Sequence, residues 1–209
     1  MGIFNGTSNF ILSKMTHEQT TFKDALEEAQ RLGFAEADPT DDVEGVDAAR
    51  KVVITSYLSF NQVIKLNDVK SVGISDITLA DINAANSLNY KIKLIGKGTY
   101  ENGYVNASVE PTLIHKNHQL AAVENEYNAI YVIGDAVGDT MFYGKGAGSL
   151  ATGSAVVSDL LNVALFFESN LHTLPPHFEL KTEETKEMMD GAEPVVIQEK
   201  SNYYIVIRF

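Results

Sequence analysis

An acidic segment that runs into a predicted helix contains the residues with the clearest chemical potential. Asp47 and Lys51 are four positions apart, so on a helix both side chains project from one face. Glu36 lies in the loop before that helix. If the loop folds back, two carboxylates and an ammonium converge, and a substrate amine finds anionic partners while its oxygen finds a proton donor. The alternative is an ordinary exposed ion pair contributing about 0.3 kcal/mol.

Two glycine-containing segments are candidate ligand contacts. Gly144, Gly146 and Gly148 precede a predicted helix, where free N–H groups can approach a phosphate or an amide. Their spacing matches neither a Walker loop nor a dinucleotide fingerprint, and a tight strand-to-helix turn explains them about as well. The segment 5–7, Asn-Gly-Thr, offers a hydroxyl and backbone N–H groups that could hold a carboxylate, or it is a turn and helix cap.

Metal centres and cysteine or serine nucleophiles are not predicted. His115 and His118 flank a polar loop without a nearby carboxylate, which makes a poor set of metal ligands. The chain has no cysteine, which excludes disulfides and thiolate chemistry and fits a reducing cytoplasm. The Gly-x-Ser-x-Gly motif of serine hydrolases is absent.

Three helices are predicted around these residues from capping signals. Residues 22–32 form an amphipathic helix with Thr21 as N-cap and a glycine at its end. A second helix is expected to start after Asp41, which would cap it, and to extend towards Phe60. Residues 79–87 form a shorter helix with the same capping pattern.

The second half of the chain alternates between strands and turns. An Asn-Gly turn at residues 102–103 joins two strands into a hairpin, and a long apolar helix is expected over residues 150–167. The predicted strands cover residues 90–95, 104–109, 127–133 and 141–143. This order predicts an α+β domain in which a mixed β-sheet is covered by helices on one face.

The charge balance argues against polyanionic partners. The 209 residues hold 28 acidic and 16 basic side chains, for a formal net charge of −12. Such a chain is a poor partner for nucleic acid and for anionic membranes. No apolar run reaches the length of a membrane span, and the N-terminus lacks the regions of a signal peptide. We expect a soluble globular protein.

Taken together, the motifs resemble homoserine dehydrogenase over most of the chain. The matching pieces are residues 2–12, 32–51, 92–94, 109–111, 128–129, 144–148 and 154–160. The resemblance implies an oxidoreductase that reduces L-aspartate 4-semialdehyde to L-homoserine with NADP or NAD, in the branch leading to threonine, methionine and isoleucine. It also implies a cytoplasmic homodimer.

The resemblance implies a role for each matching residue. A lysine in the position of Lys51 donates a proton to the aldehyde oxygen, and residues in the positions of Glu36 and Asp47 hold the substrate, chiefly its amino group. A glycine in the position of Gly146 touches the nicotinamide cofactor. The residues expected close to the substrate are Asp42, Gly6 and Thr7.

The chain also departs from the family pattern. The N-terminal Rossmann domain that binds most of the cofactor is not in this sequence, nor is the segment with the family's sodium site and a second active-site lysine. We therefore expect the chain to begin in the middle of a protein and to have little activity alone. Lys145 also replaces a proline common in the family's glycine loop.

Three segments are expected along the chain. Residues 1–170 form the catalytic and dimerisation domain, residues 171–194 a linker, and residues 195–209 the start of a truncated ACT-like regulatory domain. The competing hypothesis is a non-catalytic dimerising scaffold or amino-acid-sensing module, in which the same charges are surface pairs. A dimer formed through the sheet would leave an apolar edge or face in residues 90–95 or 127–133.

Overall fold

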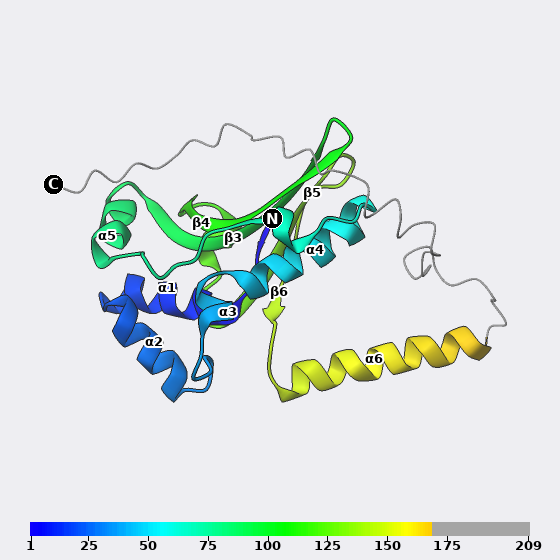
Figure 1. The fold of residues 1–209 in the computed structure, drawn as a ribbon, viewed down its shortest axis with the longest axis horizontal. Helices are drawn as coiled ribbons and strands as arrows, with labels where there is room; N and C mark the ends of the chain where they lie inside the picture. The colour runs from blue at the N-terminus through cyan, green and yellow to red at the C-terminus, as the bar shows by residue number, and fades with distance from the viewer. Residues whose placement is uncertain (169–209) are drawn as a thin grey trace.

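The computed structural model describes residues 1–168 of the chain. The predicted linker and the ACT-like strand lie outside the described residues. Figure 1 shows the elements, which in chain order are β1 (Gly2–Ile3), α1 (Gly6–Glu18), α2 (Phe22–Arg31), α3 (Thr40–Val43), α4 (Val46–Phe60), η1 (Leu66–Asp68), β2 (Lys70–Ser71), α5 (Leu79–Ser87), β3 (Tyr90–Glu101), β4 (Tyr104–His115), η2 (Gln119–Ala122), β5 (Tyr127–Gly134), β6 (Gly138–Lys145) and α6 (Ser149–Glu168).

Six strands form one mixed sheet in the order β2-β4-β3-β1-β5-β6 (Figure 1). β2 runs parallel to β4, and each other neighbouring pair is antiparallel. The predicted α+β class with a mixed sheet is confirmed. The hairpin of β3 and β4 turns at Asn102 and Gly103, whose φ angles are 52° and 90°. These positive angles are the reason that the Asn-Gly signal located the turn correctly.

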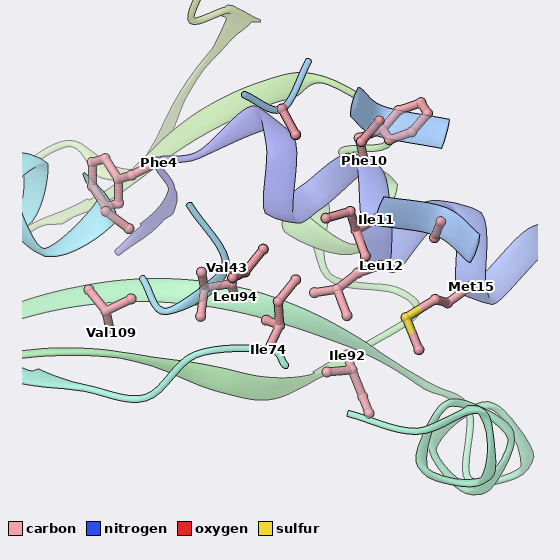
Figure 2. Packing of buried hydrophobic residues seen from close by; sticks show 14 of the residues in the cluster. Phe4, Phe10, Ile11, Leu12, Met15, Val43, Ile74, Ile92, Leu94 and Val109 are labelled. Atoms are coloured by element: carbon pink, nitrogen blue, oxygen red, sulfur yellow. The ribbon is translucent and has the colours of Figure 1, made fainter. Parts of the chain in front are cut away.

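The main hydrophobic core lies between the helices and one face of the sheet. α1, α4 and α5 all contact β3, and α4 also contacts β4. Ile92 and Leu94 point into this core with Phe10, Ile11 and Leu12 of α1 (Figure 2). Because side chains alternate along a strand, neighbouring positions point the other way, and Ile95 belongs to a second cluster that η2 covers. The predicted helical cover on one face is confirmed.

Capping signals located α2 and α5 correctly. The Thr21 hydroxyl accepts a hydrogen bond from the backbone N–H of Asp24. Thr78 and Asp81 form a complete capping box, in which the Asp81 carboxylate also accepts from the Thr78 backbone. Such local hydrogen bonds satisfy the free N–H groups of the first helical turn, so they fix a helix start independently of distant contacts.

α1 is the helix that the sequence patterns do not reveal. Its buried positions run without a gap from Thr7 to Ser13, so no single apolar stripe marks a helix. Asn5 caps it by accepting a hydrogen bond from the Ser8 backbone N–H at 2.8 Å. Of the two interpretations of the Asn-Gly-Thr segment, the helix cap is therefore correct for Asn5.

The predicted start of the second helix is wrong. Asp41 lies inside the short helix α3, and α4 begins at Val46 after Gly45, which has a φ of +77°. A positive φ is open to glycine without steric cost, so Gly45 divides the acidic segment into two helices. Asp41 instead pairs with Arg50. Asp47 consequently stands in the first turn of α4, where a negative charge is favourable.

The long apolar helix α6 follows the glycine segment as predicted. It extends away from the sheet (Figure 1), and its large apolar side chains from Leu150 to Leu165 are exposed, with Leu150 at 88%. None of the helices within residues 1–168 is both long and apolar enough to cross a membrane.

Candidate active site

Asn5 joins the N-terminus of α1 to the acidic segment. Its side-chain oxygen caps α1, and its amide nitrogen donates to Asp42 Oδ1 at 2.6 Å and to Asp47 Oδ2 at 2.9 Å. One amide therefore holds two carboxylates from α3 and α4, which Gly45 separates along the chain. The sequence predicted either a carboxylate contact or a turn and helix cap for the segment 5–7, but not these two partners, because they lie 37 and 42 residues away.

Lys51 completes this network. Its ammonium donates to Asp47 Oδ2 at 2.7 Å and to the Phe4 carbonyl at 3.0 Å. The Lys51 and Asp47 side chains are 43% and 28% exposed. Because Asn5 and Phe4 also hold this pair, it is more constrained than an ordinary surface pair on a helix. The structure thus joins Lys51, Asp47 and Asp42 in one hydrogen-bonded network.

Thr7 and Gly6 hold the neighbouring loop and strand. The Thr7 hydroxyl donates to the Phe34 carbonyl at 2.7 Å, which ties α1 to the loop that carries Glu36. A Cβ on Gly6 would lie 2.6 Å from the backbone oxygen of Glu126, so only glycine fits there. These two predicted residues border the network, and both have structural contacts of their own.

Glu36 is placed differently from the other carboxylates. Its backbone oxygen accepts from the Gln30 side chain at 3.0 Å, and its own side chain is exposed. The Glu36 carboxylate has no hydrogen bond or ion pair with any residue in the range 1–168. Asp42, and not Glu36, is the second carboxylate that hydrogen bonds join to Asp47 and Lys51. Glu36 keeps its acceptor capacity for an external cation.

A cavity of about 350 Å³ opens beside Lys51. Most of its wall is apolar, and Lys51 and Gly146 both border it. The lining residues are Ile3 and Phe4, Lys51, Ile54 and Thr55 of α4, Asn128, Ala129 and Ile130 of β5, and Phe142, Tyr143, Gly144, Lys145 and Gly146 of β6 and the following turn. A mostly apolar cavity with two lysines in its wall, Lys51 and Lys145, fits a flat ring beside a polar reacting group.

Gly144 and Gly146 lie in this wall and Gly148 follows it, and the three differ in whether the structure requires a glycine. Gly148 has a φ of +116°, which side chains rarely adopt. A Cβ on Gly146 would lie 2.1 Å from Asn128 Nδ2, whereas one on Gly144 would meet nothing within 4 Å. Lys145, which replaces the family's proline, pairs with Glu126 at 3.1 Å.

A second charged cluster lies across the sheet, around the buried Lys93. Its ammonium donates to Asn9 Oδ1 at 3.0 Å, to the Val123 carbonyl at 2.6 Å and to Glu124 Oε2 at 3.3 Å. Burial lowers the Lys93 pKa to about 8, although Glu124 opposes that change. Within residues 1–168, no group of three or more His, Asp or Glu side chains is placed to hold a metal ion.

Glu124 supplies the negative charge that pairs with Lys91 and Lys93 in this cluster. Burial acts to raise its pKa, but Lys93, Lys91 and the Ser13 hydroxyl outweigh burial and lower the pKa to about 2. His17 Nε2 also lies 3.3 Å from Glu124. The carboxylate is therefore ionised in the folded protein at any pH near neutrality.

Acid is expected to destabilise the fold through Glu124. The carboxyl pKa is about 2 in the folded state, against an ordinary value of 4.5. The folded state then binds fewer protons than the unfolded state at acidic pH. The ionised Glu124 therefore contributes up to about 3 kcal/mol to the free energy of unfolding. This contribution is fully present above pH 4.5 and is lost as the pH falls towards 2.

Urea unfolding of the chain between pH 2.5 and 6 measures this effect. Glu124→Gln should reduce the pH dependence of the free energy of unfolding. The control Glu27→Gln removes a carboxylate whose side chain is 63% exposed and should leave the dependence unchanged. The same slope in wild type and Glu124→Gln would contradict the assignment.

Comparison with known protein families identifies one match. The family model described as homoserine dehydrogenase matches residues 1–161. Among curated relatives, homoserine dehydrogenase of Bacillus subtilis (strain 168) is 55% identical over 163 residues, 78% of this chain and 38% of that protein. The enzyme of Pseudomonas aeruginosa is 46% identical over 176 residues, 84% of this chain and 41% of that protein.

Solved structures agree with this match. The crystal structure of S. aureus homoserine dehydrogenase at pH 7.5 superimposes with a TM-score of 0.78 and 86% identity, and the match covers 90% of this chain and 46% of that chain. A hyperthermophilic archaeal homoserine dehydrogenase in complex with NADPH gives a TM-score of 0.65 at 29% identity, over 78% of this chain and 46% of that one. The chain spans less than half the length of these proteins.

Proposed function

Because the chain belongs to the homoserine dehydrogenase family, we propose that it forms the substrate-binding and catalytic part of an enzyme that interconverts L-aspartate 4-semialdehyde and L-homoserine with NAD(P). The observation that carries the proposal is the position of Lys51, held by Asp47 and by the Phe4 carbonyl at the wall of the cavity that Gly146 borders. A non-catalytic scaffold is not favoured, since the relatives are named as enzymes.

The substrate ammonium is proposed to bind between Glu36 and Asp47. Glu36 offers a carboxylate that has no partner within the described residues, and Asp47 is fixed by Asn5. Charge-assisted hydrogen bonds of this kind hold an ammonium firmly and fix its direction. Asp42 would support this pair through Asn5, and Thr7 through the Phe34 carbonyl. Gly6 would lie close by, where only glycine fits against the Glu126 backbone.

Lys51 is proposed to protonate the aldehyde oxygen. When bound, the reduced nicotinamide supplies a hydride to the carbonyl carbon. The carbonyl π bond breaks towards oxygen, and a proton from the Lys51 ammonium completes the hydroxyl group. Asp47 accepts a hydrogen bond from the Lys51 ammonium at 2.7 Å and, with the Phe4 carbonyl, fixes its direction. A donor placed in this way acts where negative charge develops.

The cofactor would contact this chain mainly at the part of the cavity wall formed by Gly144 and Gly146, called here the glycine wall. Gly144 has open space around it, and Phe142 and Tyr143 provide apolar surface for a ring. The described residues contain no dinucleotide fingerprint, so the rest of NADP or NAD would be held elsewhere. The archaeal relative is in complex with NADPH, and the choice between the two cofactors for this chain stays open.

A homodimer remains part of the proposal. Of the two segments named from the sequence, residues 90–95 lie in the middle of the sheet. The other segment lies in β5, next to the edge strand β6, and exposes Ile133 at 69% and Val132 at 38%. Such a surface suits a second copy of this chain. The domain boundaries and the cytoplasmic location stay predictions from the sequence.

Turnover of a hybrid enzyme tests the proposed activity. The hybrid enzyme joins this chain to the part of S. aureus homoserine dehydrogenase that lies outside the match, a partner chosen for its 86% identity. We expect oxidation of NADPH or NADH that depends on L-aspartate 4-semialdehyde, and little or none with this chain alone. A folded hybrid enzyme without turnover would contradict the proposal.

A further inference from the structure

Asn128 occupies the junction between the cavity wall and Lys51. It lies near the start of β5, and its side-chain amide donates to the Phe4 carbonyl at 3.2 Å. The Lys51 ammonium donates to the same carbonyl at 3.0 Å. A single backbone oxygen therefore receives both side chains, and its position controls where the ammonium stands.

The same Asn128 amide nitrogen also faces Gly146 in the cavity wall. A Cβ on Gly146 would approach Asn128 Nδ2 to 2.1 Å and its Cγ to 2.8 Å. Real Cβ atoms do not approach other atoms so closely, so any larger residue at 146 must displace the amide. Gly146 has no positive φ, so its backbone conformation does not require glycine. The requirement comes from Asn128.

The Asn128 oxygen shows that this placement is not the best for the amide itself. Oδ1 is buried and has no hydrogen-bond partner within the described residues. A buried acceptor without a hydrogen-bond partner destabilises the fold. Reversing the amide would bring Oδ1 against the Phe4 carbonyl, where two acceptors repel. The side chain thus keeps the hydrogen bond from Nδ2 to the Phe4 carbonyl while Oδ1 stays without a partner within the described residues. A buried polar atom left unsatisfied in this way calls for an explanation, and a functional role is one.

We propose that Asn128 is a positioning residue that links the glycine wall to the proton donor: it holds the Phe4 carbonyl where that carbonyl orients Lys51, and residue 146 is glycine to leave room for it. The proposal deepens the proposed function, and rests on it for the role of Lys51. It predicts that a change at Gly146 acts on Lys51 through Asn128 and not only through lost cofactor contact.

A double-mutant cycle on the full chain tests this link without any turnover. The readout is the NMR signal of the Lys51 Cε protons, which reports the surroundings of the ammonium. Gly146→Ala and Asn128→Ala should each shift this signal. The double variant should match Asn128→Ala alone, because the space that the new Cβ needs is already open. Interacting pairs of this kind are non-additive.

Gly144→Ala is the matched control, since a Cβ there meets nothing within 4 Å. It should leave the Lys51 signal unchanged, and a thermal unfolding scan checks that each variant is folded. Additive shifts in the double variant, or no shift in Gly146→Ala, would overturn the proposal.

The hybrid enzyme provides the kinetic form of the test. Asn128→Ala should lower kcat about 10-fold with little change in the KM of either cofactor, because a misplaced Lys51 affects proton transfer rather than cofactor binding. Adding Gly146→Ala to Asn128→Ala should lower kcat little further. An increase in cofactor KM with unchanged kcat would contradict the link. An inactive wild-type hybrid enzyme would count against the proposed function, while the NMR cycle would still decide on Asn128.

Discussion

Lys51→Met in the hybrid enzyme is expected to lower kcat by roughly 10²- to 10⁴-fold, the usual contribution of a positioned general acid. Methionine keeps the apolar stem of the side chain but donates no proton. Because Lys51 is 43% exposed and contacts only Asp47 and the Phe4 carbonyl through its ammonium, the free energy of unfolding should change by less than about 1 kcal/mol.

Steady-state kinetics and urea unfolding measure these two quantities. Arg50→Met is the matched control, because Arg50 stands beside Lys51 on α4, pairs with Asp41 and does not line the cavity. Its kcat should remain near that of the parent enzyme. Turnover of Lys51→Met within a factor of a few of the parent would remove Lys51 as the proton donor.

Lys93→Met is expected to cause the largest loss of stability, about 3–5 kcal/mol. Lys93 is 1% exposed, and its ammonium satisfies Asn9, Val123 and Glu124. Methionine fills a similar volume but leaves the Asn9 and Val123 oxygens without this donor in the protein interior. Glu124 also loses one of its two lysine partners.

Urea unfolding of the full chain near pH 7 measures this loss. Lys23→Met is the control, because the Lys23 side chain is 83% exposed and lies 3.8 Å from Glu27. It should change the free energy of unfolding by less than about 0.5 kcal/mol. A loss below about 1 kcal/mol in Lys93→Met would show that the buried hydrogen bonds contribute little.

Elements with local signals could be predicted from the sequence. α2 and α5 begin at threonines whose hydroxyls bond three residues ahead, and the β3–β4 turn depends on two neighbouring residues. α1 has no single apolar stripe, because it is buried on most sides. α4 starts later than the sequence predicts, at Val46, because Gly45 adopts a positive φ. Burial and backbone conformation come from tertiary packing, which single-sequence patterns do not contain.

The residues of the candidate site also differ in how far local sequence patterns predict their contacts. The pairing of Asp47 with Lys51 follows from helical spacing alone. The sequence indicates the capping role of Asn5 but not the distant contacts of Asn5 and Asn128, since Asn5 reaches carboxylates more than 30 residues ahead and Asn128 reaches a carbonyl 124 residues behind. Polar side chains with short reach acquire their roles only when distant segments meet.

A crystal structure of the hybrid enzyme with reduced cofactor and L-homoserine would show directly whether Glu36, Asp47 and Lys51 bind the substrate. This pair of ligands cannot react, because both are already reduced. We predict the ligand ammonium within hydrogen-bond distance of the Glu36 and Asp47 carboxylates, and its hydroxyl oxygen beside the Lys51 ammonium, in the cavity that Gly146 borders. L-homoserine ordered at a different place, with Lys51 still bonded only to Asp47 and Phe4, would contradict the account.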